Sequence, residues 1–335
     1  MKKYRDVIGV ENLMMDFAVQ LDRIPETDSL SWMQDYLWQG GGNASTAIVT
    51  LARLGARCGM LGVVGSDAFG QFCRDDMIYH NVDVSHLFTQ NGPSNFSICL
   101  VEEQTGGRSF IVRLGVNEPL DETQADEAYI ASAKYIHISM LECSARDMAI
   151  HYAKKNGVLV SLDAGWYNPE AEDMINKSDI LIMSHDFYAA LFDGGKNHSY
   201  DQIRENCKSL LKRGPQVVVA TLGRQGCAGA DKHGSFYLPA FSGYPIVDTT
   251  GAGDVYHGGF LYAHNQGWEL ASCAKFASAV SIINSTCLGG RVGLPTLEDV
   301  EEFLANGVIC YSGTEERRKS YRDMVRFEFK TPGIR

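Results

Sequence analysis

Residues 246–260, IVDTTGAGDVYHGGF, place three small residues between an apolar run and a carboxylate. Backbone N–H groups without bulky side chains can approach a ligand closely, and a helix that starts here adds the partial positive charge of its N-terminus. The N–H groups of Gly251, Ala252 and Gly253 are therefore suited to an anion such as a phosphoryl group. Asp254 would repel that anion but could accept a proton from a substrate hydroxyl. This combination predicts phosphoryl transfer, which depends mainly on positioning and on donors aimed at the developing charge.

A simpler interpretation of the same stretch is an ordinary helix start. Thr249 or Thr250 would cap the helix, the glycines would form the turn, and Asp254 would only interact favourably with the helix dipole. Two other nucleotide-binding motifs are absent from the sequence, which contains no G-x-x-x-x-G-K-[ST] P-loop and no G-x-G-x-x-G after the first predicted strand. A kinase with this sequence is therefore not a P-loop kinase.

The composition of the 335 residues is that of a globular protein, with 45% hydrophobic and 21% charged residues. No apolar run reaches the ~18 residues of a membrane span, and the formal net charge of −11 argues against nucleic acid as a partner. Nine cysteines without a C-x-x-C pair argue against a disulfide framework and a zinc site. The start of the chain resembles a first strand more than a signal peptide, so we expect a cytoplasmic protein.

Short apolar runs alternate with amphipathic segments along most of the chain. The amphipathic segments 145–157 and 200–214 each end in basic residues and a glycine, which is typical of helix C-termini. Nearly continuous apolarity in short strands indicates burial on both faces, so the pattern predicts a parallel sheet covered by helices. The predicted strands are 6–10, 135–139, 158–163, 179–184 and 216–223.

Two regions interrupt this alternation and predict a small separate sheet. Residues 17–39 and 95–114 alternate more like antiparallel strands, and the second region contains a Gly-Gly turn at 106 and 107. The tail from 311 to 335 is locally basic, and we expect a solvated or loosely docked terminus rather than a binding segment.

Three motifs resemble those of the PfkB, or ribokinase-like, family of carbohydrate and nucleoside kinases. They are DTTGAGDVYHGGF (248–260), GGGNASTAIVTLARLGARCGMLGVVGSDAFG (40–70) and VVVATLGRQGCAGA (217–230), in the family's order. The resemblance covers about residues 6 to 305. It implies a single kinase domain over residues 1–335, folded as a three-layer α/β sandwich with a mostly parallel central sheet. It also implies that about 17–39 and 95–114 form a β-sheet lid over the sugar, through which the chain would pair as a homodimer.

The resemblance also assigns roles to individual residues. Asp254 would be the general base, and the N–H groups of Gly251, Ala252 and Gly253 would form the anion hole. Thr46 stands where relatives often have a second asparagine, which puts the usual substrate in doubt. The implied sugar-binding residues are Asp16, Gly41, Gly42, Asn43, Thr46 and Glu142, with a solvated carboxylate as the alternative for Asp16 and Glu142.

On the nucleotide side, the resemblance implies that Thr221, Gly223 and Gly226 lie along ATP. The family's N-x-x-E motif, which orders magnesium, is replaced by residues 184–187, Ser-His-Asp-Phe. Ketohexokinases also depart at this point, and Asp186 could compensate one position early. Many relatives bind a monovalent cation, such as K⁺, at the positions of Asp248 and Thr250, for which simple turn capping is the alternative.

The sequence thus predicts an ATP- and Mg²⁺-dependent kinase for a hydroxymethyl group of a small sugar or sugar derivative. Closure of the lid would exclude water, and Arg108 and Arg113 could reach an anion from it, although solvated side chains are the alternative. A nucleoside kinase remains possible, because Trp32, Trp38 or Phe96 could stack on a base or simply pack the lid. A catalytically weak sugar-binding or regulatory protein is the other alternative, favoured by the missing N-x-x-E motif.

Overall fold

The computed structural model describes residues 3–140, 143 and 145–324, and its larger β-sheet has nine strands. The strand order is β13-β12-β11-β10-β9-β8-β1-β4-β5. All neighbours from β11 to β5 are parallel, while β12 is antiparallel to both β11 and β13. The predicted mostly parallel sheet is therefore confirmed. The strands are β1 (Arg5–Val10), β4 (Cys58–Gly65), β5 (Asp83–Gln90), β8 (Ala133–Ser139), β9 (Leu159–Ala164), β10 (Ile180–Met183), β11 (Val217–Thr221), β12 (Cys227–Asp231) and β13 (Gly234–Leu238).

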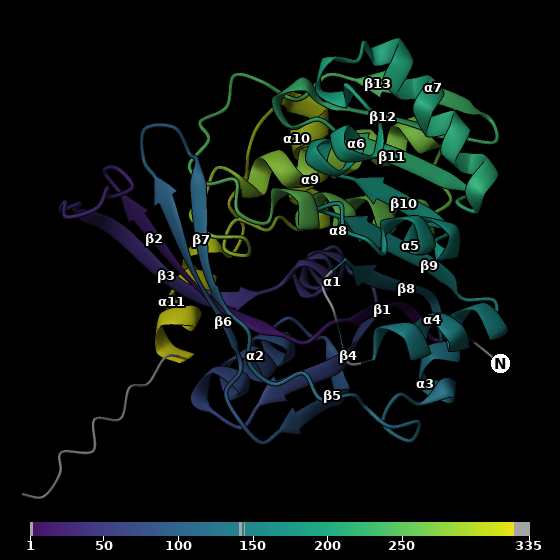
Figure 1. Ribbon diagram of the computed structural model, residues 1–335. Helices are drawn as coiled ribbons and strands as arrows, with labels where there is room; N and C mark the ends of the chain where they lie inside the picture. The colour runs from purple at the N-terminus through teal and green to yellow at the C-terminus, as the bar shows by residue number, and fades with distance from the viewer. Residues whose placement is uncertain (1–2, 141–142, 144, 325–335) are drawn as a thin grey trace, which may run out of the picture.

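Helices cover both faces of this sheet, which gives the predicted three-layer sandwich (Figure 1). Strand β10 shows why such strands are apolar throughout: Ile182 packs in the core on one face and Leu181 in the core on the other. The first core includes α1 (Asn43–Arg53), α2 (Ala68–Tyr79), α8 (Ala252–Asn265), α9 (Leu270–Asn284) and α10 (Leu297–Asn306). The second includes α3 (Glu127–Ala131), α4 (Arg146–Lys155), α5 (Ala171–Lys177), α6 (His185–Leu191) and α7 (Tyr200–Leu210).

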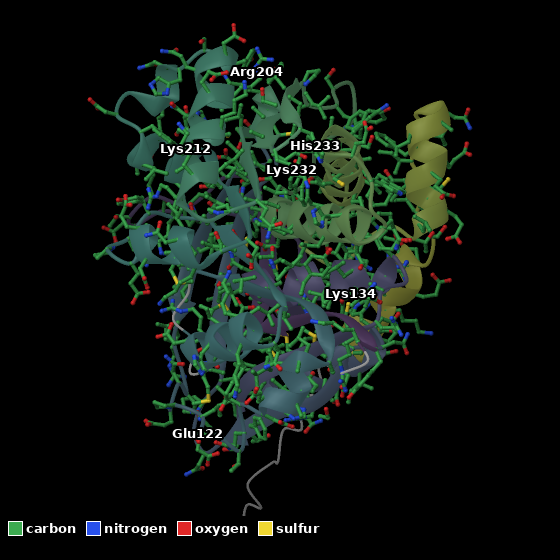
Figure 2. All side chains as sticks on the ribbon, turned by 90° about the vertical axis from the view of Figure 1, so that its right-hand side faces the viewer. Glu122, Lys134, Arg204, Lys212, Lys232 and His233 are labelled. Carbon is green, nitrogen blue, oxygen red and sulfur yellow. The ribbon has the colours of Figure 1, made fainter. Side chains whose placement is uncertain are left out.

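The nine strands of the large sheet lie side by side along the long dimension of the molecule, from β13 at one end to β5 at the other. Figure 2 shows Lys232 and His233, from the turn between β12 and β13, at a distance from Glu122, which precedes α3 at the other end. Lys134, at the start of β8, lies between them (Figure 2). In open α/β sheets, ligands bind at the carboxyl ends of the strands where the strand order reverses. Here that point lies at β1, whose neighbours are β8 and β4.

The small sheet has four strands in the order β3-β2-β6-β7 and projects from the side of the large sheet (Figure 1). Its strands are β2 (Met14–Leu21), β3 (Met33–Gly41), β6 (Asn95–Glu102) and β7 (Arg108–Arg113). The predicted second sheet is confirmed, but its strands are not all antiparallel as expected, because β2 and β6 pair in parallel. Trp38 stacks on Phe17 at 4.1 Å between ring centroids and lies 6.1 Å from Phe96, which favours packing within the sheet as the role of these rings.

The C-terminal helix α11 (Thr314–Met324) corrects the expectation of a solvated tail. Arg317 and Tyr321, four residues apart on one helix face, are both almost fully buried. The Arg317 guanidinium donates to the carbonyl oxygens of Val292 and Leu294, each at 2.9 Å. A solvated or loosely docked terminus is therefore wrong for this helix, because its core-facing side chains satisfy buried backbone acceptors. The tail residues 325–335 lie outside the described residues.

None of the helices in the described part of the chain has the length and apolar character needed to cross a bilayer.

Candidate active site

The loop before α8 places Asp254 in the first turn of that helix. The helix begins at Ala252, and Gly251 before it has a φ of 70°, a left-handed conformation that favours glycine. No described side chain caps this helix, so the simpler interpretation with a threonine cap is wrong. The N–H of Ala252 donates to the Thr249 carbonyl at 3.2 Å, and a Cβ added at Gly253 would meet no described atom within 4 Å. The turn is therefore open at Gly253, where an anion can approach first-turn N–H groups.

Acidic neighbours set the electrostatics of Asp254. Burial raises the pKa of its carboxyl group well above the usual value, and the charges of Asp163 and Glu11 raise this pKa further. The Arg108 guanidinium acts in the opposite direction. A carboxylate with a raised pKa is a stronger base, and a general base works best when its pKa lies near the working pH. The surroundings of Asp254 thus suit proton acceptance.

Asp248 holds the same loop from behind. Its carboxylate is fully buried and accepts the N–H groups of Thr250 and Gly289, each at 2.8 Å. The hydroxyl of Thr250 lies 3.1 Å from the Cys99 sulfur of β6. These contacts support the turn-capping alternative for Asp248, and its predicted role in binding a monovalent cation stays a prediction.

The glycine-rich stretch 40–42 allows charged side chains to approach the backbone. A Cβ on the first glycine would clash with the ion pair of Arg291 and Asp76. A Cβ on the second would clash with the Asp16 carboxylate, and one on the third would lie 2.5 Å from Glu11 Oε2. The stretch was expected to let substrate hydroxyls approach the backbone; in addition, each of its glycines makes room for a buried carboxylate or guanidinium.

Asp16 lies on β2 at the point where the small sheet meets the large one. Burial raises the pKa of its carboxyl group to about 6, although the Ser97 hydroxyl, which donates to Oδ1 at 2.6 Å, and the Arg291 charge lower it. The nearby Asp248 raises it. The side chain is buried, so the alternative of a solvated surface carboxylate is wrong for this residue.

Asn43 and Glu11 form a connected group at the start of α1. The Glu11 carboxylate accepts the N–H of Asn43 at 3.0 Å and that of Ser45 at 2.9 Å, so it caps the helix from the end of β1. The Asn43 amide donates to Asp163 Oδ2 at 3.2 Å, and His257 Nε2 lies 3.2 Å from the other oxygen of Asp163. Burial alone would raise the pKa of Asp163, but the neighbouring His257 brings it below its usual value. The donor end of the Asn43 amide is therefore oriented by protein contacts.

A small pocket of about 70 Å³ lies where the two sheets join. Its wall combines a carboxyl group, asparagine amides and two apolar side chains. Small-molecule sites have a similar mixture, in which a few polar groups orient the ligand, but their volumes of roughly 300–1,000 Å³ are larger than this pocket. The lining residues are Glu11, Asn12, Met14, Gly42, Asn95, Leu114 and Asn117.

Two predicted sugar-binding residues, Thr46 and Glu142, are not placed at the site as free ligands for the sugar by the described contacts. The Thr46 hydroxyl accepts a hydrogen bond from Arg291 Nε at 3.2 Å, so this hydroxyl is engaged with the protein. Glu142 lies outside the described residues.

The predicted nucleotide-binding turn follows β11. Thr221 ends the strand, and Gly223 begins a short 3-10 helix, η3 (Gly223–Gln225), with a φ of 57°. A Cβ at Gly223 would meet no described atom within 4 Å, so this position is open. Gly226 has a φ of 97°, and a Cβ there would lie only 2.7 Å from the Ala240 nitrogen. The turn thus needs glycine at its end and leaves its start accessible.

Arg108 connects the small sheet to the Asp254 loop. Its guanidinium donates to the Thr249 hydroxyl at 2.6 Å, and the same hydroxyl lies 3.3 Å from the Gly106 carbonyl. Both Arg108 and Arg113, which lie at opposite ends of β7, are exposed. Arg108 nevertheless contacts the loop through Thr249. Of the two arginines, Arg108 is therefore the one whose charge reaches the loop.

The model of the pfkB family of carbohydrate kinases matches residues 5–297, which is most of the chain. The chain belongs to this family. A 5-dehydro-2-deoxygluconokinase of Clostridium perfringens is 27% identical over 343 residues and 97% of both chains. A nucleoside kinase of Methanothermobacter thermautotrophicus is 25% identical over 91% of this chain and 97% of its own length. The structure of Arabidopsis thaliana ribokinase complexed with ribose and ATP has the same fold, with a TM-score of 0.76, 21% identity, and coverage of 91% of this chain and 99% of that one.

In this carbohydrate kinase the structure gives a physical role to the segment 184–187, which was expected to replace the family's N-x-x-E motif. The Ser184 hydroxyl accepts the Phe187 N–H at 3.0 Å and thereby caps α6, while Phe187 is buried in the core. Asp186 is exposed and forms an ion pair with Lys196 at 3.1 Å. Compensation of the missing glutamate by Asp186 remains a hypothesis, and it would require this carboxylate to exchange Lys196 for a metal ion.

Several residues at the site were not found from the sequence of this kinase. Glu11 and Asp163 each follow or end an apolar strand, so their position at a strand end was a usable signal. His257 and Arg291 gave no such signal, because their partners lie far away in the sequence.

Proposed function

We propose that this kinase transfers the terminal phosphoryl group of ATP to a hydroxymethyl group of a small sugar or sugar derivative. The observation that carries the proposal is the position of Asp254, a carboxylate with a raised pKa that directly follows an open glycine turn at a helix N-terminus. The two parts of the reaction, proton removal and stabilisation of the transferring group, are thus served by neighbouring residues.

Each group has a distinct task in this proposal. Asp254 accepts the hydroxyl proton as the new O–P bond forms. The N–H groups of residues 251–253 bind the phosphoryl oxygens, for which the Ala252 N–H exchanges the Thr249 carbonyl for the ligand. Arg108 contributes a positive charge from the small sheet. Asp16 and Asn43 bind substrate hydroxyls, because the first is a buried and the second a half-buried polar group beside the glycine-rich stretch.

ATP is expected along Thr221, Gly223 and Gly226, and the open Gly223 fits a close approach of phosphates. Among the described residues, no three His, Cys, Asp or Glu side chains are grouped so as to hold a metal ion. Mg²⁺ is commonly held by substrate phosphates and water with only one or two carboxylates, so ATP would supply most of its ligands. Bound Mg²⁺ would neutralise charge on the phosphates.

We also propose a homodimer formed through the small sheet, which would act as a lid. Large apolar side chains are exposed on this sheet and on the loop between β2 and β3, including Ile111 of β7 at 57% and Leu30 and Trp32 of the loop, each at 66%. Exposed apolar patches of this kind mark interaction sites. The nine cysteines are all free, which supports a reducing compartment, the cytoplasm.

The proposal is tested by measuring ADP release with ketohexoses, aldopentoses, sugar acids and nucleosides, each against an Asp254→Asn control. We expect one sugar class to stimulate ATP consumption in the wild-type protein and not in the variant. A nucleoside as the best acceptor would favour the nucleoside kinase alternative. Sugar binding, detected by a thermal shift, without any stimulated ATP use would favour a sugar-binding or regulatory protein.

A further inference from the structure

A fully buried guanidinium, that of Arg291, lies directly behind the glycine-rich stretch. Its Nη2 donates to the Gly41 carbonyl at 2.9 Å and to the Ser45 hydroxyl at 2.8 Å, and its Nε donates to Thr46. Its backbone N–H donates to the Gln39 side chain at 3.2 Å. Arg291 thus contacts the segment that carries the candidate sugar-binding residues on both sides of Asn43.

The same guanidinium forms an ion pair with Asp76 of α2, which is also fully buried. Burying a charge pair is costly, and replacing such a pair with well-packed apolar residues is often neutral or stabilising. Packing stability is therefore a weak reason for this arginine. Its planar array of donors can, however, fix several acceptors at once, which an apolar side chain cannot do.

The charge of Arg291 also acts on the substrate site itself. It lowers the pKa of Asp16, the buried carboxylate on the other side of Gly41. The guanidinium thereby favours the ionised form of a residue proposed to accept substrate hydroxyl protons in hydrogen bonds.

The C-terminal helix closes this network from the outside. Asp76 lies 3.5 Å from His80, and His80 Nε2 lies 2.9 Å from the Tyr321 hydroxyl of α11. Burial lowers the pKa of His80 to about 4, so the ring is neutral near pH 7. Arg317 of α11 binds the carbonyl of Val292, the residue next to Arg291. The helix thus reaches the partner of Arg291 through His80, and it directly contacts the backbone next to Arg291.

We propose that Arg291 is a positioning residue of the sugar site and that α11 holds it in place, an inference that rests on the proposed function. Arg291 sets the path of the backbone from Gly41 to Thr46, so that Asp16 and Asn43 meet the substrate in a fixed geometry. The C-terminal helix then contributes to sugar affinity without touching the sugar.

The test compares two conservative variants with matched controls. Arg291→Lys keeps the charge but loses the planar donors, and Tyr321→Phe removes the hydroxyl that contacts His80. Arg5→Lys alters a partly buried arginine paired with Asp83 at the opposite ends of the strands. Tyr135→Phe removes the hydroxyl of another tyrosine–histidine contact, 3.0 Å long, with His264.

We expect Arg291→Lys to raise the KM for the sugar roughly tenfold, equivalent to ~1.4 kcal/mol, and Tyr321→Phe to raise it by about threefold. The KM for ATP should stay within about twofold in both variants, because the positioning role concerns the sugar site alone. A general loss of stability would instead affect the KM values for both substrates. Both controls should leave the two KM values unchanged.

A sugar KM in both variants equal to that of the controls would overturn the proposal. If Arg291→Lys does not fold, Tyr321→Phe against Tyr135→Phe decides alone. If the wild-type protein shows no sugar-stimulated ATP use, the proposed function fails. The sugar-induced thermal shift without ATP then decides the positioning role: a smaller shift in Arg291→Lys than in Arg5→Lys supports it, and equal shifts refute it.

Discussion

At the scale of the residue, the chemistry depends on how Asp254 is kept basic beside an open turn. Its carboxylate must be ionised to accept a proton, and its pKa is raised by burial and then by Asp163. Turnover should therefore fall as the pH decreases through this raised pKa. The fall should lie at a higher pH than the usual pKa of aspartic acid, which is about 3.9.

Asp163→Asn tests this account of Asp254. Removal of the Asp163 charge should lower the pKa of Asp254, so the acidic limb of the kcat–pH profile should move to lower pH. Asp83→Asn, at the opposite ends of the strands, should leave the limb in place. The profile is measured by steady-state kinetics, and an acidic limb that stays in place or moves to higher pH contradicts the assignment.

Gly253→Ala separates the role of the turn in folding from its role in catalysis. A methyl group there meets no described atom within 4 Å, and alanine favours a helix over glycine by roughly 0.5–1 kcal/mol. We expect the melting temperature to be kept or raised, while kcat falls at least about tenfold because the methyl group occupies the space of the phosphoryl group. Gly234→Ala on β13 is the matched control, with equally open surroundings. Unchanged turnover in Gly253→Ala would refute the anion-binding role of the turn.

At the scale of the element, helix α1 begins where it does because of a residue outside it. Glu11 accepts two N–H groups of the first turn, and no described side chain from the neighbouring loop caps the helix. Burial raises the pKa of Glu11 from 4.5 to about 7. The folded protein therefore binds this proton more tightly than the unfolded chain.

The contribution of Glu11 to stability should accordingly depend on pH. It is fully present below the unfolded pKa of 4.5 and is lost as the pH rises through about 7. We expect the free energy of unfolding to fall between pH 5 and pH 8 by on the order of 1–3 kcal/mol from this group. Urea unfolding should show a smaller fall in Glu11→Gln than in the wild-type protein. An equal pH dependence in the two proteins would show that Glu11 is not the group responsible.

Five consecutive strands of the large sheet and helices α4 and α7 could be predicted from local patterns, because short apolar runs and amphipathic segments report burial directly. Helix α11 could not be, since its sequence TEERRKSYRDM is strongly polar and it buries an arginine and a tyrosine instead of an aliphatic stripe. The motifs predicted Asp254 and the glycine stretches. The contacts of Arg291 lay beyond such reasoning, because Asp76 is 215 residues away in the sequence and only the folded chain brings the two together.

At the scale of the whole molecule, the small sheet presents an exposed apolar surface. Strand β7 is exposed along all six residues, and Phe110 and Ile111 lie in its middle. The proposed homodimer would bury this surface, so Ile111→Asp should produce a monomer by sedimentation analysis. Val308→Asp, at an exposed apolar residue outside both sheets, should leave the assembly unchanged. A wild-type protein that sediments as a monomer at all concentrations would rule out the dimer.

The pocket between the sheets has a consequence for any movement of the small sheet. The chain passes between the two sheets at residues 11–13, 41–43, 91–95 and 114–117, and the pocket residues come from these crossings or from the strand ends beside them. A hinge for the small sheet must lie in the same crossings, so residues that line the pocket are also placed where the chain would bend. If the pocket binds the sugar, substitutions that alter sugar preference at Asn12 or Asn117 should therefore alter opening and closing rates as well, and selectivity would be coupled to speed.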